Sequence, residues 1–220
     1  MSTLSLVIGN KNYSSWSLRP WLFLKNAGIP FEEIRISLFT PDMDEHIAQY
    51  SPAGRVPVLL DGELRIWESL AICEYLAENY PQAQGWPADR DARALARAIS
   101  CEMHAGFTAL RSEMPMNCRS RRRLNPSPEA QADIARVIDI WLDCRERYGQ
   151  HGPWLFGDFS IADAMFAPVV SRFNTYGVEL PEVARQYAAT MNAHPALQEW
   201  VAAGHAETEL IEEDEAGTPV

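Results

Sequence analysis

The chain has 220 residues, of which 47% are hydrophobic and 22% charged, and its formal net charge is -11. This is an ordinary globular composition, with apolar material for one large domain or two small ones. The acidic balance argues against a broad nucleic-acid surface, because phosphate binding needs a basic footprint. No segment approaches the roughly 20 apolar residues that cross a bilayer, and the first ten residues lack a basic, strongly apolar signal pattern. We therefore expect a cytoplasmic protein without a membrane partner.

Residues 1–80 predict strands and helices in the order βαβαββα. Apolar runs at 4–8 and 56–60, and alternation at 31–38 and 63–67, indicate strands, with Asp61-Gly62 as a hairpin signal between the last two. Helical spacing of apolar residues, or a polar helical pattern, predicts helices over 17–28, 42–49 and 70–80. This order, with a proline opening the hairpin, resembles an α/β thioredoxin-like domain.

The rest of the chain predicts helices alone. Residues 81–91 are rich in proline, glycine and polar side chains, which is typical of a linker between domains. Helical patterns then run over 92–116, 129–148, 160–174, 181–192 and 195–203. We expect an all-α domain over 92–207 and, because it is acidic with little to bury it, a frayed tail over 208–220.

The cysteines and histidines indicate no metal or disulfide framework. The four cysteines form no CxxC pair and lie in or near apolar helical patterns, so we expect buried structural thiols at Cys73, Cys101, Cys118 and Cys144. The five histidines are scattered without metal-ligand spacing. The arginine run at 119–123 is interpreted as a solvated helix end or loop, with a rim that attracts an acidic substrate as the alternative.

The segment Tyr13-Ser14-Ser15-Trp16-Ser17 lies between the first strand and the first helix. Serines at a helix start are usually N-caps. The same position also offers free N–H groups and the positive end of the helix dipole, which lower the pKa of a thiol held there. A serine hydroxyl could then donate a hydrogen bond to a bound thiolate without being a nucleophile itself.

Two further features come from the hairpin and the helix after it. In Arg55-Val56-Pro57, a cis bond before Pro57 would leave the Val56 backbone free to pair with an extended peptide; an ordinary trans proline at a strand start is the alternative. Glu68-Ser69 precedes the helix of residues 70–80. The pair can simply cap that helix, or it can hold the ammonium and carboxylate groups of an α-amino acid.

Over nearly its whole length the chain resembles the soluble glutathione S-transferases. Ser14, Ser15, Ser17 and Arg19 form an SSxSxR string that is similar to the serine motif of the zeta class, the maleylacetoacetate isomerase-like group, which has a cysteine where this chain has Trp16. The resemblance implies that Ser14, with Ser15 as runner-up, stabilises the thiolate of glutathione. It also implies that Arg55, Val56, Pro57, Glu68 and Ser69 bind glutathione, and that the protein is a homodimer.

The helical domain adds two motifs. Ser160-Ile161-Ala162-Asp163 has the [ST]xxD pattern of a capping box, which is a folding feature. The segment Gly106 to Asn117 resembles the family's wall of the electrophile pocket. Candidate secondary residues for this pocket are Tyr13, Trp16, Thr108, Arg111, Ser112 and Met114. Met114 and Met116 are equally well interpreted as core filler, and Arg111 as a surface charge.

The resemblance therefore predicts an enzyme that uses glutathione as cosubstrate against a small apolar electrophile. Glutathione-dependent isomerisation and a non-catalytic glutathione-binding module are the alternatives. A thiol–disulfide oxidoreductase ranks lower, because that chemistry needs a cysteine at the start of the first helix, where this chain has Ser14 and Ser15.

Overall fold

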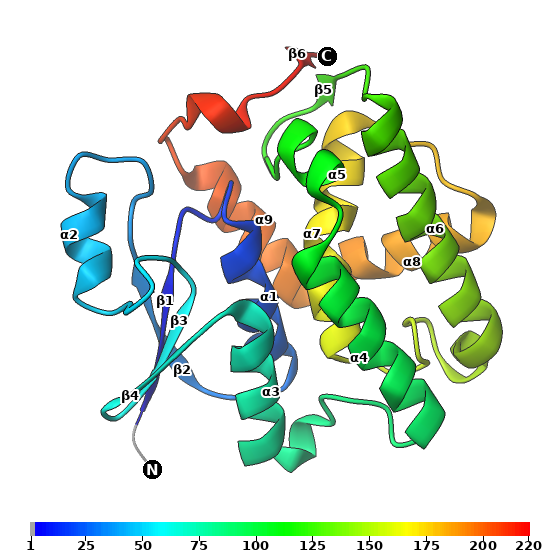
Figure 1. The fold of residues 1–220 in the computed structure, drawn as a ribbon, viewed down its shortest axis with the longest axis horizontal. Coiled ribbons are helices and arrows are strands. Elements are labelled where there is room, and N and C mark those ends of the chain that lie inside the picture. Colours follow the sequence, from blue (N-terminus) through cyan, green and yellow to red (C-terminus); the bar gives the residue numbers. More distant parts are fainter. Residues whose placement is uncertain (1–2) are drawn as a thin grey trace.

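The computed structural model describes residues 3–220. The chain opens with a mixed sheet of strand order β2-β1-β3-β4, in which β2 runs parallel to β1 while the other neighbouring pairs are antiparallel. Helices α1 and α3 lie between this sheet and the helical part of the chain, and α2 lies on the other side of the sheet (Figure 1). The elements are β1 Leu4–Ile8, α1 Ser15–Asn26, β2 Phe31–Arg35, α2 Met43–Ala48, β3 Val58–Asp61, β4 Leu64–Trp67 and α3 Ser69–Asn79. The predicted order βαβαββα is confirmed.

Strand β1 is apolar along most of its length because both faces of the sheet are covered. Side chains alternate between the faces of a strand, so Leu4, Leu6 and Ile8 enter the large core under α1 and α3. Val7 points the other way, into a smaller cluster with Ile47 of α2. This two-sided burial explains why the strand reads as a continuous apolar run.

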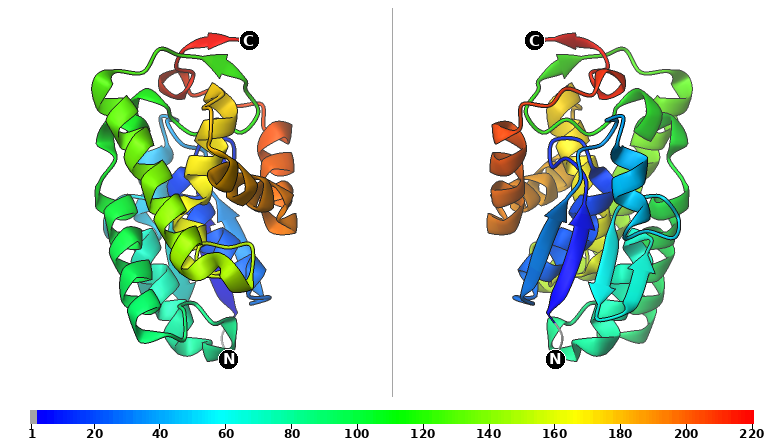
Figure 2. Two further views of the ribbon diagram at one scale, coloured as in Figure 1. Left: turned by 90° about the vertical axis from the view of Figure 1, so that its right-hand side faces the viewer. Right: turned by 90° about the vertical axis from the view of Figure 1, so that its left-hand side faces the viewer.

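The second part of the chain is mainly helical. Its elements are η1 Pro81–Ala83, α4 Arg90–Ala105, α5 Thr108–Glu113, β5 Arg122–Arg123, α6 Pro128–Tyr148, η2 Gly149–His151, α7 Ile161–Tyr176, α8 Glu182–Ala193, α9 Pro195–Ala206, η3 Glu212–Asp214 and β6 Thr218–Pro219. Helix α7 is buried on nearly every side because α1, α4 and α8 all pack against it. The views of Figure 2 place α7 beside α1, so one core runs through both parts of the molecule.

The single long helix predicted over 92–116 is wrong. Helix α4 ends at Ala105, and α5 starts only at Thr108. Between them Gly106 is extended and Phe107 adopts a left-handed φ of 56°. A Cβ on Gly106 would lie 2.8 Å from the Glu102 carbonyl oxygen, so the chain needs glycine at this turn. The apolar spacing continues across the break, which hides it from periodicity.

The frayed tail predicted for residues 208–220 is also wrong. Strand β6 pairs with β5, and Ile211 is buried. The Glu215 carboxylate accepts hydrogen bonds from Arg122 Nη1 at 2.6 Å and from Asn117 Nδ2 at 2.8 Å. The tail lies over the top of the molecule beside β5 (Figure 1). Its negative charge is therefore matched by a specific partner, which composition alone does not reveal.

The arginine run supplies that partner. Arg122 is buried and donates to three carbonyl oxygens of the tail as well as to Glu215. Arg119 donates to the carbonyl oxygens of Glu207 and Glu209. Arg121 and Arg123 are exposed, as expected of a solvated loop, whereas that interpretation is wrong for Arg122.

The cysteines are buried at three of the four predicted positions. Cys101 is the exception, because it lies on the exposed side of α4. All four thiols are free. Within residues 3–220 no helix is long and apolar enough to span a bilayer, and no three potential ligand side chains gather as a metal site would require.

The predicted capping box at the start of α7 is confirmed. The Asp163 carboxylate accepts hydrogen bonds from the backbone N–H of Leu155 at 3.1 Å and of Ser160 at 2.9 Å, and from the Ser160 hydroxyl at 3.1 Å. Asp163 is fully buried, and burial raises its pKa to about 6. The carboxylate thus joins the loop before α7 to the first turn of that helix.

We expect the Asp163→Ala variant to lower the free energy of unfolding by about 2 kcal/mol or more, because two buried N–H groups and one hydroxyl lose their acceptor. Chemical denaturation of both proteins measures this difference. Asp158→Ala is the matched control, since that side chain is exposed five residues earlier. Equal stability of the two variants would contradict a structural role for the capping box.

The raised pKa of Asp163 also predicts a pH dependence. Its folded pKa of about 6 exceeds the 3.8 expected for the unfolded chain. The native state therefore keeps a proton that the unfolded state loses, and the stabilising contribution of this group falls as pH rises through that window. The difference in unfolding free energy between the parent and Asp163→Asn should shrink from pH 4 to pH 6. A constant difference would show that Asp163 does not titrate there.

Candidate functional site

Two neighbouring cavities open along the junction between the sheet domain and the helical domain. The first cavity, of about 450 Å³, lies between the β4–α3 junction and α4 with α5. The second cavity, of about 420 Å³, lies between the start of α1, the segment around α2 and the chain after α5. They share the side chains of Trp16, Arg55, Val56 and Arg111. A ligand could therefore extend from one cavity into the other.

The first cavity presents a carboxylate and an unpaired hydroxyl at the start of α3. Glu68 is the N-cap residue of α3 and has a positive φ of 70°, which is rare for a residue other than glycine. The Ser69 side chain is buried, and its Oγ has no hydrogen-bond partner in the described chain. A buried unpaired hydroxyl at a helix N-terminus is suited to bind a carboxylate, while Glu68 is suited to bind an ammonium group.

The Val56–Pro57 peptide bond is cis, as predicted for a binding role. Val56 precedes strand β3, and within residues 3–220 neither its N–H nor its C=O is hydrogen-bonded. Val56 lines both cavities. Its free backbone groups can therefore pair with an extended peptide that crosses from the first cavity to the second.

The two candidate serines differ in how their hydroxyl protons are used. Ser14 is the N-cap of α1, and its Oγ donates to Ser17 Oγ at 2.7 Å while accepting from the Ser17 N–H at 3.4 Å. Ser15 Oγ instead accepts from Nη2 of Arg172 at 3.2 Å. Among residues 3–220 the Ser15 hydroxyl donates to no recorded acceptor, so its proton can be donated into the second cavity, which both serines line.

Arg172 comes from α7 and is buried. Its Nε donates to the Met114 carbonyl oxygen at 2.8 Å, so its position is fixed from two sides. Burial, and secondarily the charge of Arg111, lowers the pKa of Arg172 to about 10, which leaves it cationic at neutral pH. A positive charge behind Ser15 stabilises an anion in front of it.

The second cavity combines apolar walls with charge. Its apolar residues are Leu38, Phe39, Met43, Ile47, Pro115 and Met116. Arg55, Arg111 and Arg172 contribute guanidinium groups, and Asp214 of the tail contributes a carboxyl group. Burial raises the pKa of Asp214 to about 6, although Arg172 opposes the shift.

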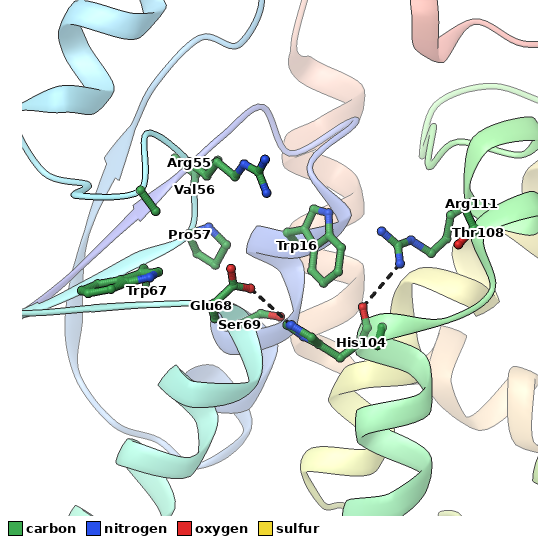
Figure 3. A pocket seen from close by; sticks show the side chains of 12 residues that line it. Trp16, Arg55, Val56, Pro57, Trp67, Glu68, Ser69, His104, Thr108 and Arg111 are labelled. Atoms are coloured by element: carbon green, nitrogen blue, oxygen red, sulfur yellow. Dashed lines mark hydrogen bonds and ion pairs between the residues drawn. The ribbon is translucent and has the colours of Figure 1, made fainter.

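Trp16 lines both cavities, and Figure 3 shows its ring between His104 and the Arg55 side chain at the first of them. The Arg19 guanidinium lies 4.2 Å from the centre of its ring and that of Arg111 4.6 Å, while the His104 ring packs edge-on at 5.2 Å. Arg19 is buried, and its Nε and Nη1 have no acceptor among residues 3–220. The aromatic ring is thus a principal partner of this buried cation.

The remaining predicted residues lie in different places. Thr108 lines the first cavity and Ser112 the second. Met114 is buried and lines neither cavity, so it packs in the core while Met116 forms part of the wall. The Tyr13 hydroxyl lies at the second cavity but donates to Glu215 and accepts from Arg119, and burial followed by the Glu215 bond raises its pKa.

Sequence reasoning missed His104, Arg172 and Asp214. His104 lies inside an amphipathic helix pattern, where polar residues are expected and indicate no site. Arg172 had a usable signal, because a lone arginine in the apolar run of α7 must have a specific partner if it is buried. Asp214 belongs to a segment that composition assigned to disorder.

The two parts of the chain match two family models. Residues 13–79 match "Glutathione S-transferase, N-terminal domain", and residues 92–203 match "Glutathione S-transferase, C-terminal domain". The maleylacetoacetate isomerase of Rattus norvegicus is 31% identical over 76% of each chain. A probable maleylacetoacetate isomerase of Caenorhabditis elegans is 27% identical over 76% of this chain and 77% of that one.

A solved structure gives a similar result. The crystal structure of a glutathione transferase homolog from Burkholderia, with bound glutathione, superposes with a TM-score of 0.70 at 27% identity and covers 94% of this chain and all of that one.

Proposed function

This chain belongs to the glutathione S-transferase family, and we propose that it binds glutathione across both cavities and activates the thiol for attack on a small electrophile. The observation that carries the proposal is that three incompletely bonded groups line the two cavities in succession: Ser69 Oγ the first, the Val56 backbone both, and the Ser15 hydroxyl the second. They match the γ-glutamyl end, the cysteinyl backbone and the thiol of glutathione in that order.

The γ-glutamyl end fits the first cavity by charge. Its ammonium group pairs with Glu68, and its carboxylate accepts from the Ser69 hydroxyl and the start of α3. The cysteinyl residue then pairs with Val56 beside Pro57, with Arg55 at the shared wall. This arrangement directs the thiol toward the N-terminus of α1.

The geometry favours Ser15 over Ser14 as the activating hydroxyl. The Ser14 proton is committed to Ser17, whereas Ser15 receives a hydrogen bond from a cation and retains its own proton. A lowering of the thiol pKa by two units corresponds to about 2.7 kcal/mol. One hydrogen bond to a charged group contributes about 1.5–3 kcal/mol, so Ser15 together with the N-terminus of α1 can supply the free energy needed to lower the thiol pKa.

The second cavity indicates the kind of electrophile. Its apolar residues suit the small apolar body expected from the sequence, and its guanidinium groups add a preference for an anionic end. Conjugation of a small electrophile that bears a carboxylate satisfies both features.

Glutathione-dependent isomerisation is the second candidate, favoured by the maleylacetoacetate isomerases among the relatives. In that case the thiolate adds to an unsaturated carboxylate and leaves again, so glutathione is regenerated. Product analysis distinguishes the two, because only conjugation consumes the thiol. Glutathione binding without turnover of aryl halides or unsaturated acids would favour the non-catalytic module.

We also propose a cytoplasmic homodimer. Free cysteines are typical of a reducing compartment. Strand β4 lies at the edge of the sheet, where Leu64 and Trp67 are 50% and 42% exposed. Trp67 also lines the first cavity, so a second copy that covers β4 would border the glutathione site.

Replacing Ser15 by alanine should raise the pKa of bound glutathione by one to two units and lower kcat/KM at neutral pH roughly 10- to 100-fold, because the thiolate loses its donor. Ultraviolet absorbance of the bound thiolate and the pH profile of kcat/KM measure this change. Ser14→Ala is the comparison variant, which should mainly lower stability, by about 1 kcal/mol, through loss of the N-cap.

The reverse pattern, with the larger thiol pKa change in Ser14→Ala, would assign activation to Ser14. Unchanged thiol pKa values in both variants would contradict activation by either serine.

The variant Leu64→Glu should convert the dimer to a monomer, because it places a charge on the apolar edge. Light scattering measures the mass of both proteins across a concentration series. Glu63→Gln, an exposed change in the adjoining turn, is the control. A dimeric Leu64→Glu protein would place the interface elsewhere.

A further inference from the structure

His104 of α4 is the only side chain of residues 3–220 that the structure records bonded to the Glu68 carboxylate. Its Nε2 lies 3.2 Å from Glu68 Oε2, and its ring packs edge-on against Trp16. Figure 3 shows the bond reaching from α4 to the start of α3 across the first cavity. The contact joins the helical domain to the group that we assign to the γ-glutamyl ammonium.

The bond fixes the tautomer of His104. Because a carboxylate oxygen only accepts hydrogen bonds, the 3.2 Å approach favours a proton on Nε2 that is directed at Glu68. Nδ1 is buried and has no partner in the described chain. Protonation of Nδ1 would create a buried donor with no acceptor, which is costly. The surroundings therefore favour the neutral Nε2–H form.

The charges around His104 act in the same direction. Arg19 of α1 and Arg111 of α5 face it as cations, and Glu68 faces it as an anion. Burial, and then the charge of Arg19, lowers the pKa of His104 despite the opposing effect of Glu68. At neutral pH the imidazole is uncharged.

We propose that His104 is a positioning residue for the α-amino group of glutathione: its neutral Nε2–H orients the Glu68 carboxylate in the first cavity without neutralising it. A cation in this place would compete with the substrate ammonium for the same carboxylate and repel it. A neutral donor leaves the full negative charge for the ligand and fixes the direction of that charge. This inference rests on the proposed binding of glutathione.

Two substitutions of similar chemistry separate position from packing. The amide nitrogen of a glutamine reaches about as far as histidine Nε2, whereas that of asparagine reaches only as far as Nδ1. His104→Gln should therefore keep the bond to Glu68, and His104→Asn should lose it. Thermal unfolding of both variants checks that each is folded.

The probes are glutathione and its analogue that lacks the α-amino group of the γ-glutamyl residue. Calorimetry should give a Kd for glutathione roughly tenfold higher in His104→Asn and within about twofold of the parent in His104→Gln. The analogue should bind the parent and both variants with Kd values within about twofold of one another. The kcat at saturating glutathione should change little, because His104 lines the first cavity and Ser15, the proposed partner of the thiol, lines the second.

The pH dependence gives an independent readout. The pKa of His104 lies below the ordinary histidine value of 6.5. Its protonation at lower pH places a cation beside the ammonium site, so parent affinity for glutathione should fall more steeply as pH decreases below 6.5 than that of His104→Gln. Equal loss of affinity for both probes in His104→Asn, or no loss for either, would overturn the positioning role. A parent protein that binds no glutathione would instead refute the proposed function.

Discussion

The site depends on one buried contact between the two domains, the hydrogen bond from Arg172 of α7 to Ser15 at the start of α1. Helices α1 and α7 share the main core, so packing places the N-terminus of α1 within reach of the α7 side chains. Arg172 would be costly to bury without fixed acceptors, and it has them in Ser15 and the Met114 carbonyl oxygen. The same contact orients the hydroxyl and supplies the positive charge behind it.

A cationic site inside an acidic protein follows from this arrangement. The chain carries a net charge of -11, yet Arg111 and Arg172 line the cavities and Arg19 is buried against Trp16, which lines both of them. Burial lowers the pKa of each of them, and their mutual repulsion adds to the effect on Arg19 and Arg172. Each guanidinium would be better stabilised with an anion nearby, so this arrangement favours a thiolate or a carboxylate ligand.

The sequence was sufficient for the features that follow local rules. The order of elements along residues 1–80, the hairpin at Asp61-Gly62 and the capping box of Asp163 depend on nearby residues, and all three are confirmed. The ordered tail instead depends on contacts far along the chain. Arg122 lies 93 positions before Glu215, so neither segment alone shows that the other will bury and bond it. The pairing of His104 with Glu68 is hidden for the same reason.

Trp16 shows how a departure from the family pattern is absorbed. At the position where the zeta class has a cysteine, this chain has the Trp16 ring. The guanidinium groups of Arg19 and Arg111 lie within 4.6 Å of the ring centre, and the His104 ring packs edge-on against it. A thiol could not provide the aromatic face that compensates a buried guanidinium. The tryptophan therefore packs against two cations of the site and lines both cavities, while the chemistry of a cysteine thiol is absent at this position. One side chain thus contacts both guanidinium groups and forms part of the wall that the two cavities share.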